Sequence, residues 1–132
     1  MPDDSTDDDF LAALENGTLP LAAFDHRAHV RAGYLYVTRH GLGGAIERFA
    51  RTLKAFAARH GKDGLYHETI TVAFLALINE HAAARGARDW GSFIAANPEL
   101  LERRTLLHFY APEELASAEA RRVFKLPRTR VA

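Results

Sequence analysis

Apolar residues recur three and four positions apart along most of the chain, and this spacing predicts helices. Three stretches carry the pattern most clearly, each with a stripe along one face. These stripes are Val30, Gly33, Tyr34 and Val37; Ile46, Phe49, Leu53 and Phe56; and Ile70, Ala73, Phe74, Leu77 and Ile78. We expect helices over 25–40, 45–60 and 65–84, with the core of the molecule between them.

Glycine and proline set the limits of these helices. Gly41–Gly44 and Gly61–Gly64 follow two of them, and both glycine-rich segments favour a helix end. Shorter helices are expected elsewhere, over 9–15, 89–94, 100–109 and 112–120. No stretch alternates between apolar and polar residues for long enough to predict a strand. The sequence therefore predicts an all-α fold, a compact bundle of about five helices in a single domain.

The two ends of the chain differ from the middle in composition. Residues 1–8 are rich in aspartate and hold no apolar side chain beyond Met1, so we expect a disordered acidic arm. Residues 125–132 contain Pro127 and several basic side chains, so we expect an irregular basic tail. The helical domain is then expected to span residues 9–124.

Composition narrows the classes of function. The chain has 132 residues, 48% of them hydrophobic, which suits one domain with its own core. Its 17 basic and 17 acidic residues balance, which argues against nucleic-acid or anionic-membrane binding. The absence of cysteine excludes thiol catalysis and thiolate metal ligands. No apolar run reaches the length of a membrane span, and the acidic start is unlike a signal peptide. We therefore expect a cytoplasmic protein, and the oligomeric state is left open.

Three histidines stand on faces that the apolar pattern assigns to the core. His26 and His29 are three residues apart, so one helix projects them to the same side, and His67 shares a face with Phe74. Three imidazoles are a familiar ligand set for zinc, and histidine with carboxylate also suits iron. We expect these three side chains to hold a divalent metal, zinc or iron. The alternative is structural: His26 and His29 cap and staple a helix start, and His67 bonds a carbonyl.

Three further side chains are candidates for chemistry beside such a site. Glu68 and Tyr66 are candidate catalytic residues, because a carboxylate and a phenol can move protons. Arg121 is a candidate for binding an anionic substrate. Each has a simpler interpretation: Glu68 favours a helix start through the dipole, Tyr66 packs, and Arg121 is solvated.

Several segments resemble a family of small bacterial all-helical proteins of unassigned activity. The segments that carry the resemblance are Phe24-x-His26-x-x-His29-Val30, Tyr66-His67-Glu68-Thr69-Ile70-Thr71, Asn97-Pro98-Glu99-Leu100-Leu101, Leu115-x-Ser117 and Ala120-Arg121-x-x-Phe124-x-x-Pro127. The chain departs from the pattern at Ala111, where serine is usual, and at Arg128, where aspartate follows the proline. The resemblance implies that the histidines, Tyr66 and Glu68 belong to one motif set. It implies no activity, substrate or cofactor.

These observations favour a metal-binding helical protein whose partner is a small molecule. In one version it is an enzyme that acts on a small, anionic substrate at a site formed by His26, His29 and His67. In another it is a non-catalytic module that binds a small ligand or senses a metal. A third interpretation is an interaction protein with structural histidines. Whether the protein is an enzyme is left open.

Overall fold

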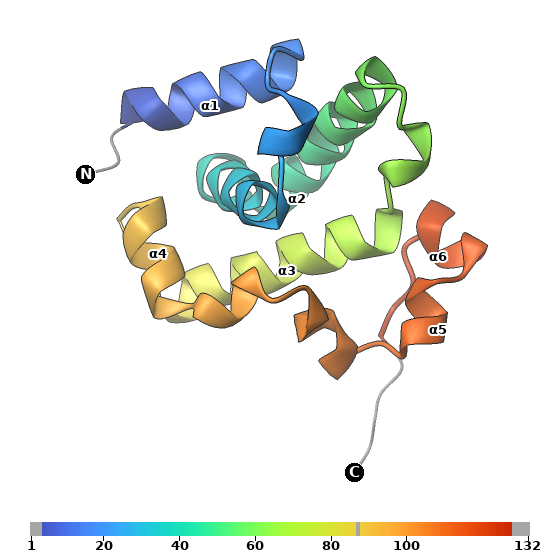
Figure 1. The fold of residues 1–132 in the computed structure, drawn as a ribbon. Helices are drawn as coiled ribbons and strands as arrows, with labels where there is room; N and C mark the ends of the chain where they lie inside the picture. Colours follow the sequence, from blue (N-terminus) through green and yellow to red (C-terminus); the bar gives the residue numbers. More distant parts are fainter. Residues whose placement is uncertain (1–3, 87, 128–132) are drawn as a thin grey trace.

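The computed structural model describes residues 4–86 and 88–127, and these residues form helices joined by short turns (Figure 1). The α-helices are α1 (Asp4–Asn16), α2 (His26–Arg59), α3 (Glu68–Ala84), α4 (Trp90–Ala96), α5 (Pro112–Leu115) and α6 (Ala118–Arg122). The 3₁₀ helices are η1 (Leu21–Ala23), η2 (Asp63–Leu65), η3 (Pro98–Leu101) and η4 (Arg103–His108). No strand occurs within these ranges, so the all-α prediction is confirmed.

The number and length of the helices differ from the expected bundle of about five. Long helices occupy the first two thirds of the described chain, whereas the part after α4 consists of helices of six residues or fewer. These short elements run back along α3 toward its N-terminus (Figure 1). None of the helices in the described ranges is long and apolar enough to cross a membrane.

The long helix α2 has one break, at Gly41. The backbone of Gly41 has φ 75° and ψ 171°, a conformation that residues with a side chain rarely adopt. The helix therefore consists of two straight halves that point in different directions (Figure 1). This confirms the predicted interruption after residue 40, although helical hydrogen bonding resumes at once rather than after Gly44.

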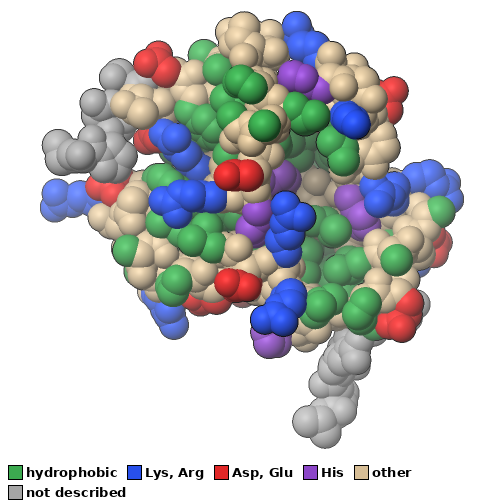
Figure 2. Space-filling view, viewed as in Figure 1, with side chains coloured by type: hydrophobic (Ala, Val, Ile, Leu, Met, Phe, Trp, Pro, Cys, Tyr) green, Lys and Arg blue, Asp and Glu red, His purple; other side chains and the backbone are tan. Residues whose placement is uncertain are grey.

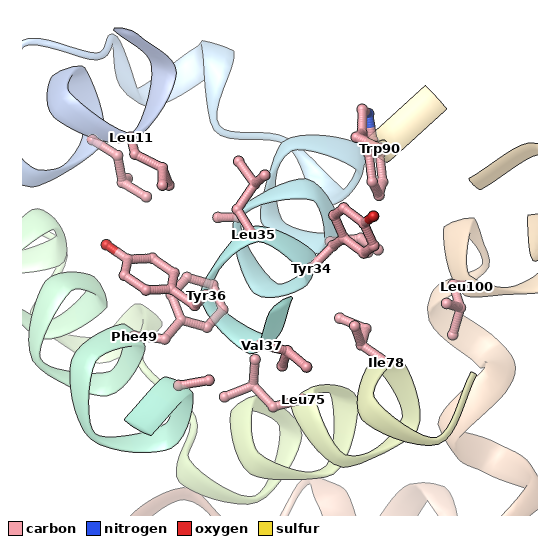
Figure 3. Close-up of a cluster of buried hydrophobic side chains, with 14 of the residues drawn as sticks. Leu11, Tyr34, Leu35, Tyr36, Val37, Phe49, Leu75, Ile78, Trp90 and Leu100 are labelled. Atoms are coloured by element: carbon pink, nitrogen blue, oxygen red, sulfur yellow. The ribbon is translucent and has the colours of Figure 1, made fainter. Parts of the chain in front are cut away.

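The main core lies where α2 crosses α3, with α1 and α4 at its sides (Figure 3). Its least exposed members include Leu14, Val30, Phe49, Leu75, Ile78, Phe93 and Leu100. The crossing is close: a Cβ on Gly33 of α2 would lie 2.9 Å from Cδ1 of Ile78 on α3. On another side of α3, Phe74 packs with Leu106 and Tyr110 in a smaller apolar cluster. The wide apolar face predicted for this helix therefore contacts two parts of the chain.

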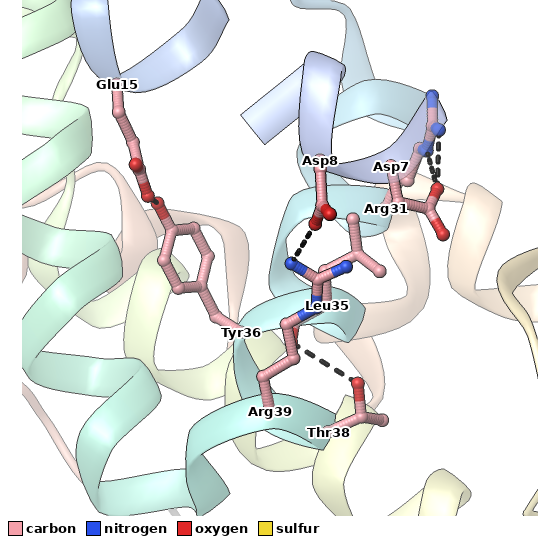
Figure 4. A network of polar contacts seen from close by, with 8 residues as sticks. All are labelled: Asp7, Asp8, Glu15, Arg31, Leu35, Tyr36, Thr38 and Arg39. Carbon is pink, nitrogen blue, oxygen red and sulfur yellow. Dashed lines mark hydrogen bonds and ion pairs between the residues drawn. The ribbon is translucent and has the colours of Figure 1, made fainter. Parts of the chain in front are cut away.

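The structure corrects the expected disordered arm. Helix α1 begins at Asp4, so the arm from that residue onward is helical, and residues 1–3 lie outside the described chain. Asp7 is buried and pairs with Arg31 at 2.6 Å, and Asp8 pairs with Arg39 at 2.8 Å (Figure 4). Composition alone missed these contacts because both arginines lie on a different helix.

Hydrogen bonds from side chains to the main chain hold the last segment to the start of α3. The hydroxyl of Thr69 donates to the carbonyl of Val123 at 3.0 Å and accepts from the amide of Lys125 at 3.1 Å. The hydroxyl of Tyr110 donates to the carbonyl of Lys125 at 2.7 Å. Residues 125–127 have no regular structure, as expected for the tail, and residues 128–132 lie outside the described chain.

Candidate functional site

An apolar cavity of about 340 Å³ lies between the two halves of α2, the start of α3 and the C-terminal segment. We call it the apolar cavity. Its hydrophobic walls are formed by Leu21, Phe24, Leu53, Phe56, Ala57, Leu65, Ile70, Phe74, Leu106 and Leu115. Its polar lining consists of Asp25, His26, His29, Tyr66, His67, Thr71 and Arg103. All three predicted histidines therefore face one cavity. Figure 2 shows histidine side chains beside basic side chains near the middle of one face.

His26 is the first residue of α2 and connects this helix to η3. Its Nε2 lies 3.1 Å from the carbonyl oxygen of Leu100. A carbonyl only accepts hydrogen bonds, so Nε2 carries the proton and the neutral ring keeps its free lone pair on Nδ1. Burial lowers the pKa of His26, and the nearby positive charge of Arg103 acts in the same direction.

His29 lies one turn further along α2, among aromatic rings. Its ring centroid is 5.5 Å from that of Phe24 and 5.1 Å from that of Phe49. Among the described residues no group forms a hydrogen bond with its side chain. The pKa of His29 is lowered to about 4, mainly by burial and also by repulsion from a protonated His26 and from Arg103. His29 is therefore a neutral imidazole at pH 7 with nitrogen atoms available to a ligand.

His67 has a different role, because the protein uses both of its ring nitrogens. Nδ1 accepts from the amide of Ile70 at 3.1 Å and thereby caps α3. Nε2 must then carry the proton, and it donates to the carbonyl of Leu115 at 2.7 Å. This contact is the carbonyl bond that the structural interpretation anticipated. His67 lines the cavity, but it directs no free lone pair into it.

The three histidines do not fit a shared metal centre in this arrangement. Metal ligation by imidazole needs a lone pair aimed at the ion from about 2.1 Å. Both nitrogens of His67 are engaged, and the rings of His26 and His29 stack with centroids 6.5 Å apart and only 14° between their planes. Within the described ranges no three side chains of His, Cys, Asp or Glu are placed to hold an ion. Metal binding stays a prediction from the sequence.

The other predicted residues line a second, polar cavity of about 500 Å³. It is formed by Lys54, Asp63, Gly64, Tyr66, Glu68, Arg121 and Arg122, and we call it the polar cavity. The hydroxyl of Tyr66 donates to Oε1 of Glu68 at 2.6 Å. Burial, followed by this carboxylate, raises the pKa of Tyr66. The sequence-predicted site is therefore divided: the histidines lie in one cavity, Glu68 and Arg121 in the other, and Tyr66 lines both.

Arg121 binds the main chain of residues 64–66, which lies between the two cavities. Its Nη1 donates to the carbonyl of Gly64 at 2.6 Å and to that of Tyr66 at 3.3 Å. The guanidinium is thus fixed by the main chain, and among the described residues its other N–H groups have no hydrogen-bond partner.

Arg103 is a site residue that the sequence did not indicate. It lies at the apolar cavity, lowers the pKa of both His26 and His29, and makes no ion pair or hydrogen bond with the residues that the structure describes. It belongs to a short 3₁₀ helix without an amphipathic pattern, next to a second arginine. Nothing in the local sequence distinguishes it from a solvated surface residue.

Comparisons with protein-family models, with curated proteins and with solved structures find no match to this chain. The resemblance based on the histidine motifs stays a prediction.

Proposed function

We propose that the apolar cavity binds a small organic molecule with an apolar body and one acidic group. The observation that carries this proposal is the pairing of an apolar lining with two polar side chains that lack protein partners. Among the described residues, the side chain of His29 forms no hydrogen bond and that of Arg103 no ion pair. Apolar pockets with a few convergent polar groups are the usual form of small-molecule sites.

The size and charge of the cavity limit the ligand. A volume of about 340 Å³ lies near the lower end of the range for ligand pockets, which favours a ring system or short chain. Arg103 is suited to bind a carboxylate through two N–H groups, and the neutral His29 offers one donor and one acceptor. Asp25 lies on the same wall and disfavours a second negative charge on the ligand. The preferred ligand is therefore a small monoanion.

Binding without catalysis agrees best with the pKa of His29. A general base is most effective when its pKa lies near the working pH, and a pKa of about 4 makes His29 a weak base at pH 7. Burial also lowers the pKa of His26, whose Nδ1 is free, and His67 has no free nitrogen. We therefore propose a binding or sensing module in preference to an enzyme.

Two fluorescent probes of similar shape and different charge test this function. 1-Anilinonaphthalene-8-sulfonate is apolar with one negative charge, and N-phenyl-1-naphthylamine is its neutral counterpart. Arg103→Gln is expected to raise the Kd of the sulfonate about tenfold, because a charge-assisted hydrogen bond is lost. The Kd of the neutral amine should not change. The control is Arg104→Gln, an exposed neighbour on η4 that does not line the cavity.

Amide chemical-shift mapping of the folded parent protein locates the bound probe. We expect the largest changes at His29, Thr71 and Phe74, which line the apolar cavity. Equal weakening of sulfonate binding by the two arginine variants, or no saturable binding of either probe, would refute the proposal.

A metal ion bound by His29 is the second candidate, because its neutral ring has a free lone pair. Elemental analysis of protein purified without a histidine tag, after growth with added zinc and iron, tests this alternative. About one metal per chain in the parent, lost in His29→Ala, would favour metal binding. No metal in the parent would remove it.

A further inference from the structure

We propose that the polar cavity is a second binding site, which takes the phosphate group of a small phosphate monoester. This site is separate from the apolar cavity and does not depend on the function proposed for it. The proposal rests on three basic side chains that line the polar cavity together: Lys54 from α2, and Arg121 and Arg122 from α6.

Two of these cations have no carboxylate partner among the described residues. Lys54 and Arg122 form no ion pair among the described residues, although Lys54 lies 5.0 Å above the ring of Tyr66. Some other basic residues of α2 do have a carboxylate partner, such as Arg51, which pairs with Glu47 at 3.0 Å. Unpaired cations that line a concave surface concentrate positive potential and attract anions.

The position of Arg121 is fixed by the main chain before any ligand binds. Two main-chain carbonyls, those of Gly64 and Tyr66, hold its Nη1 at the edge of the cavity. A guanidinium that is positioned before binding loses less conformational freedom when it contacts an oxyanion. The planar fork of arginine matches the geometry of a phosphate group.

The lining of the polar cavity also contains two acidic residues. Glu68 accepts a hydrogen bond from Tyr66. Asp63 is the first residue of η2. Three cations against two carboxylates leave one net positive charge. Glu68 therefore opposes anion binding, and its neutralisation should improve binding. A purely structural role for the basic residues would not predict that neutralising Glu68 strengthens phosphate binding.

Titration with inorganic phosphate, followed by amide chemical shifts, tests the site. The ionic strength is kept constant with chloride. The parent should show saturable shifts at Gly64, Glu68 and Arg121. Arg122→Gln and Lys54→Gln should each weaken phosphate binding about fivefold, because each removes one charge at a solvent-exposed position. Glu68→Gln should strengthen binding about threefold, since glutamine still accepts the hydrogen bond from Tyr66.

Two control variants complete the experiment. Arg51→Gln removes an exposed charge from α2 outside the cavity and should leave phosphate binding unchanged. Arg103→Gln should also leave it unchanged while it weakens the sulfonate probe, so the two proposals can fail separately. Equal shifts with chloride alone, an equal loss in Arg51→Gln, or weaker binding in Glu68→Gln would overturn the phosphate site.

Discussion

The helices α1 to α3 and the segment after α4 are stabilised in different ways. The long helices pack through fully buried apolar side chains such as Phe49, Leu75 and Ile78 (Figure 3). The later segment has short helices and a smaller apolar cluster, and it is fastened by side chains that bond main-chain carbonyls. Burial thus supplies stability, whereas directed hydrogen bonds supply position.

The apolar cavity lies where these two regions meet. His26 of α2 bonds the carbonyl of Leu100, and His67 at the start of α3 bonds that of Leu115. One wall is therefore formed by the long helices of the core, and the other is joined to them by these two hydrogen bonds. Substitutions in each region separate the two contributions.

Phe49→Ala should remove the most stability. Phe49 is 1% exposed and stacks on Tyr36, and loss of a buried phenyl group typically costs about 3–5 kcal/mol. The matched change in the later segment is Phe109→Ala, at a side chain that is 39% exposed, which should cost under about 1 kcal/mol. Urea unfolding of both variants measures the difference. Similar losses would contradict the division between the regions.

Stability should fall between pH 6.5 and pH 4 because of His29. The unfolded chain takes up a proton on this ring near pH 6.5, whereas the folded protein does so only near pH 4. The contribution is complete above pH 6.5 and is lost as the pH falls to about 4, with a maximum of about 3 kcal/mol. In His29→Leu the free energy of unfolding should vary less over this window. An identical pH dependence in parent and variant would show that His29 is not buried as a neutral ring.

His67→Ala should cost about 2 kcal/mol, because it removes both the cap of α3 and the bond to Leu115. His67→Asn retains a capping side chain but not the longer bond, so it should recover about half of the loss. Amide hydrogen exchange adds the local readout. In both variants, the amide exchange rates of residues 110–127 should increase more than those of the helices α2 and α3. Uniform acceleration over the chain would argue against a separately attached segment.

The smallest effect is expected at the surface of α1. Asp8→Asn should cost under about 0.5 kcal/mol, since the side chain of Asp8 is 63% exposed. Asp7→Asn should cost about 1 kcal/mol more, because its partner Arg31 would keep an uncompensated charge next to a buried side chain. Thermal unfolding at low and high salt distinguishes them: added salt should reduce the effect of Asp8→Asn only. Equal costs would mean that exposure does not decide the strength of these pairs.

The sequence predicted the features that depend on local periodicity. The spacing of apolar residues indicated α3 and both halves of α2, and it placed His26, His29 and His67 on faces that do meet at one cavity. The features that it missed depend on distant partners. His67 bonds a carbonyl 48 residues away, and the helical state of residues 4–8 accompanies ion pairs with arginines of α2. Arg103 had no local signal at all.

The break in α2 makes the cavity mechanically sensitive to a residue outside it. His26 and His29 belong to the half of α2 before Gly41, and Leu53 and Phe56 belong to the half after it. The cavity is therefore lined by both halves of a helix that bends at Gly41. Fifteen helical residues separate Gly41 from Phe56, a lever arm of about 22 Å. A turn of about 10° at Gly41 would therefore displace Phe56 by about 4 Å. A Cβ placed on Gly41 would meet no side chain within 4 Å, so a substitution there is opposed by the positive φ of this residue rather than by crowding.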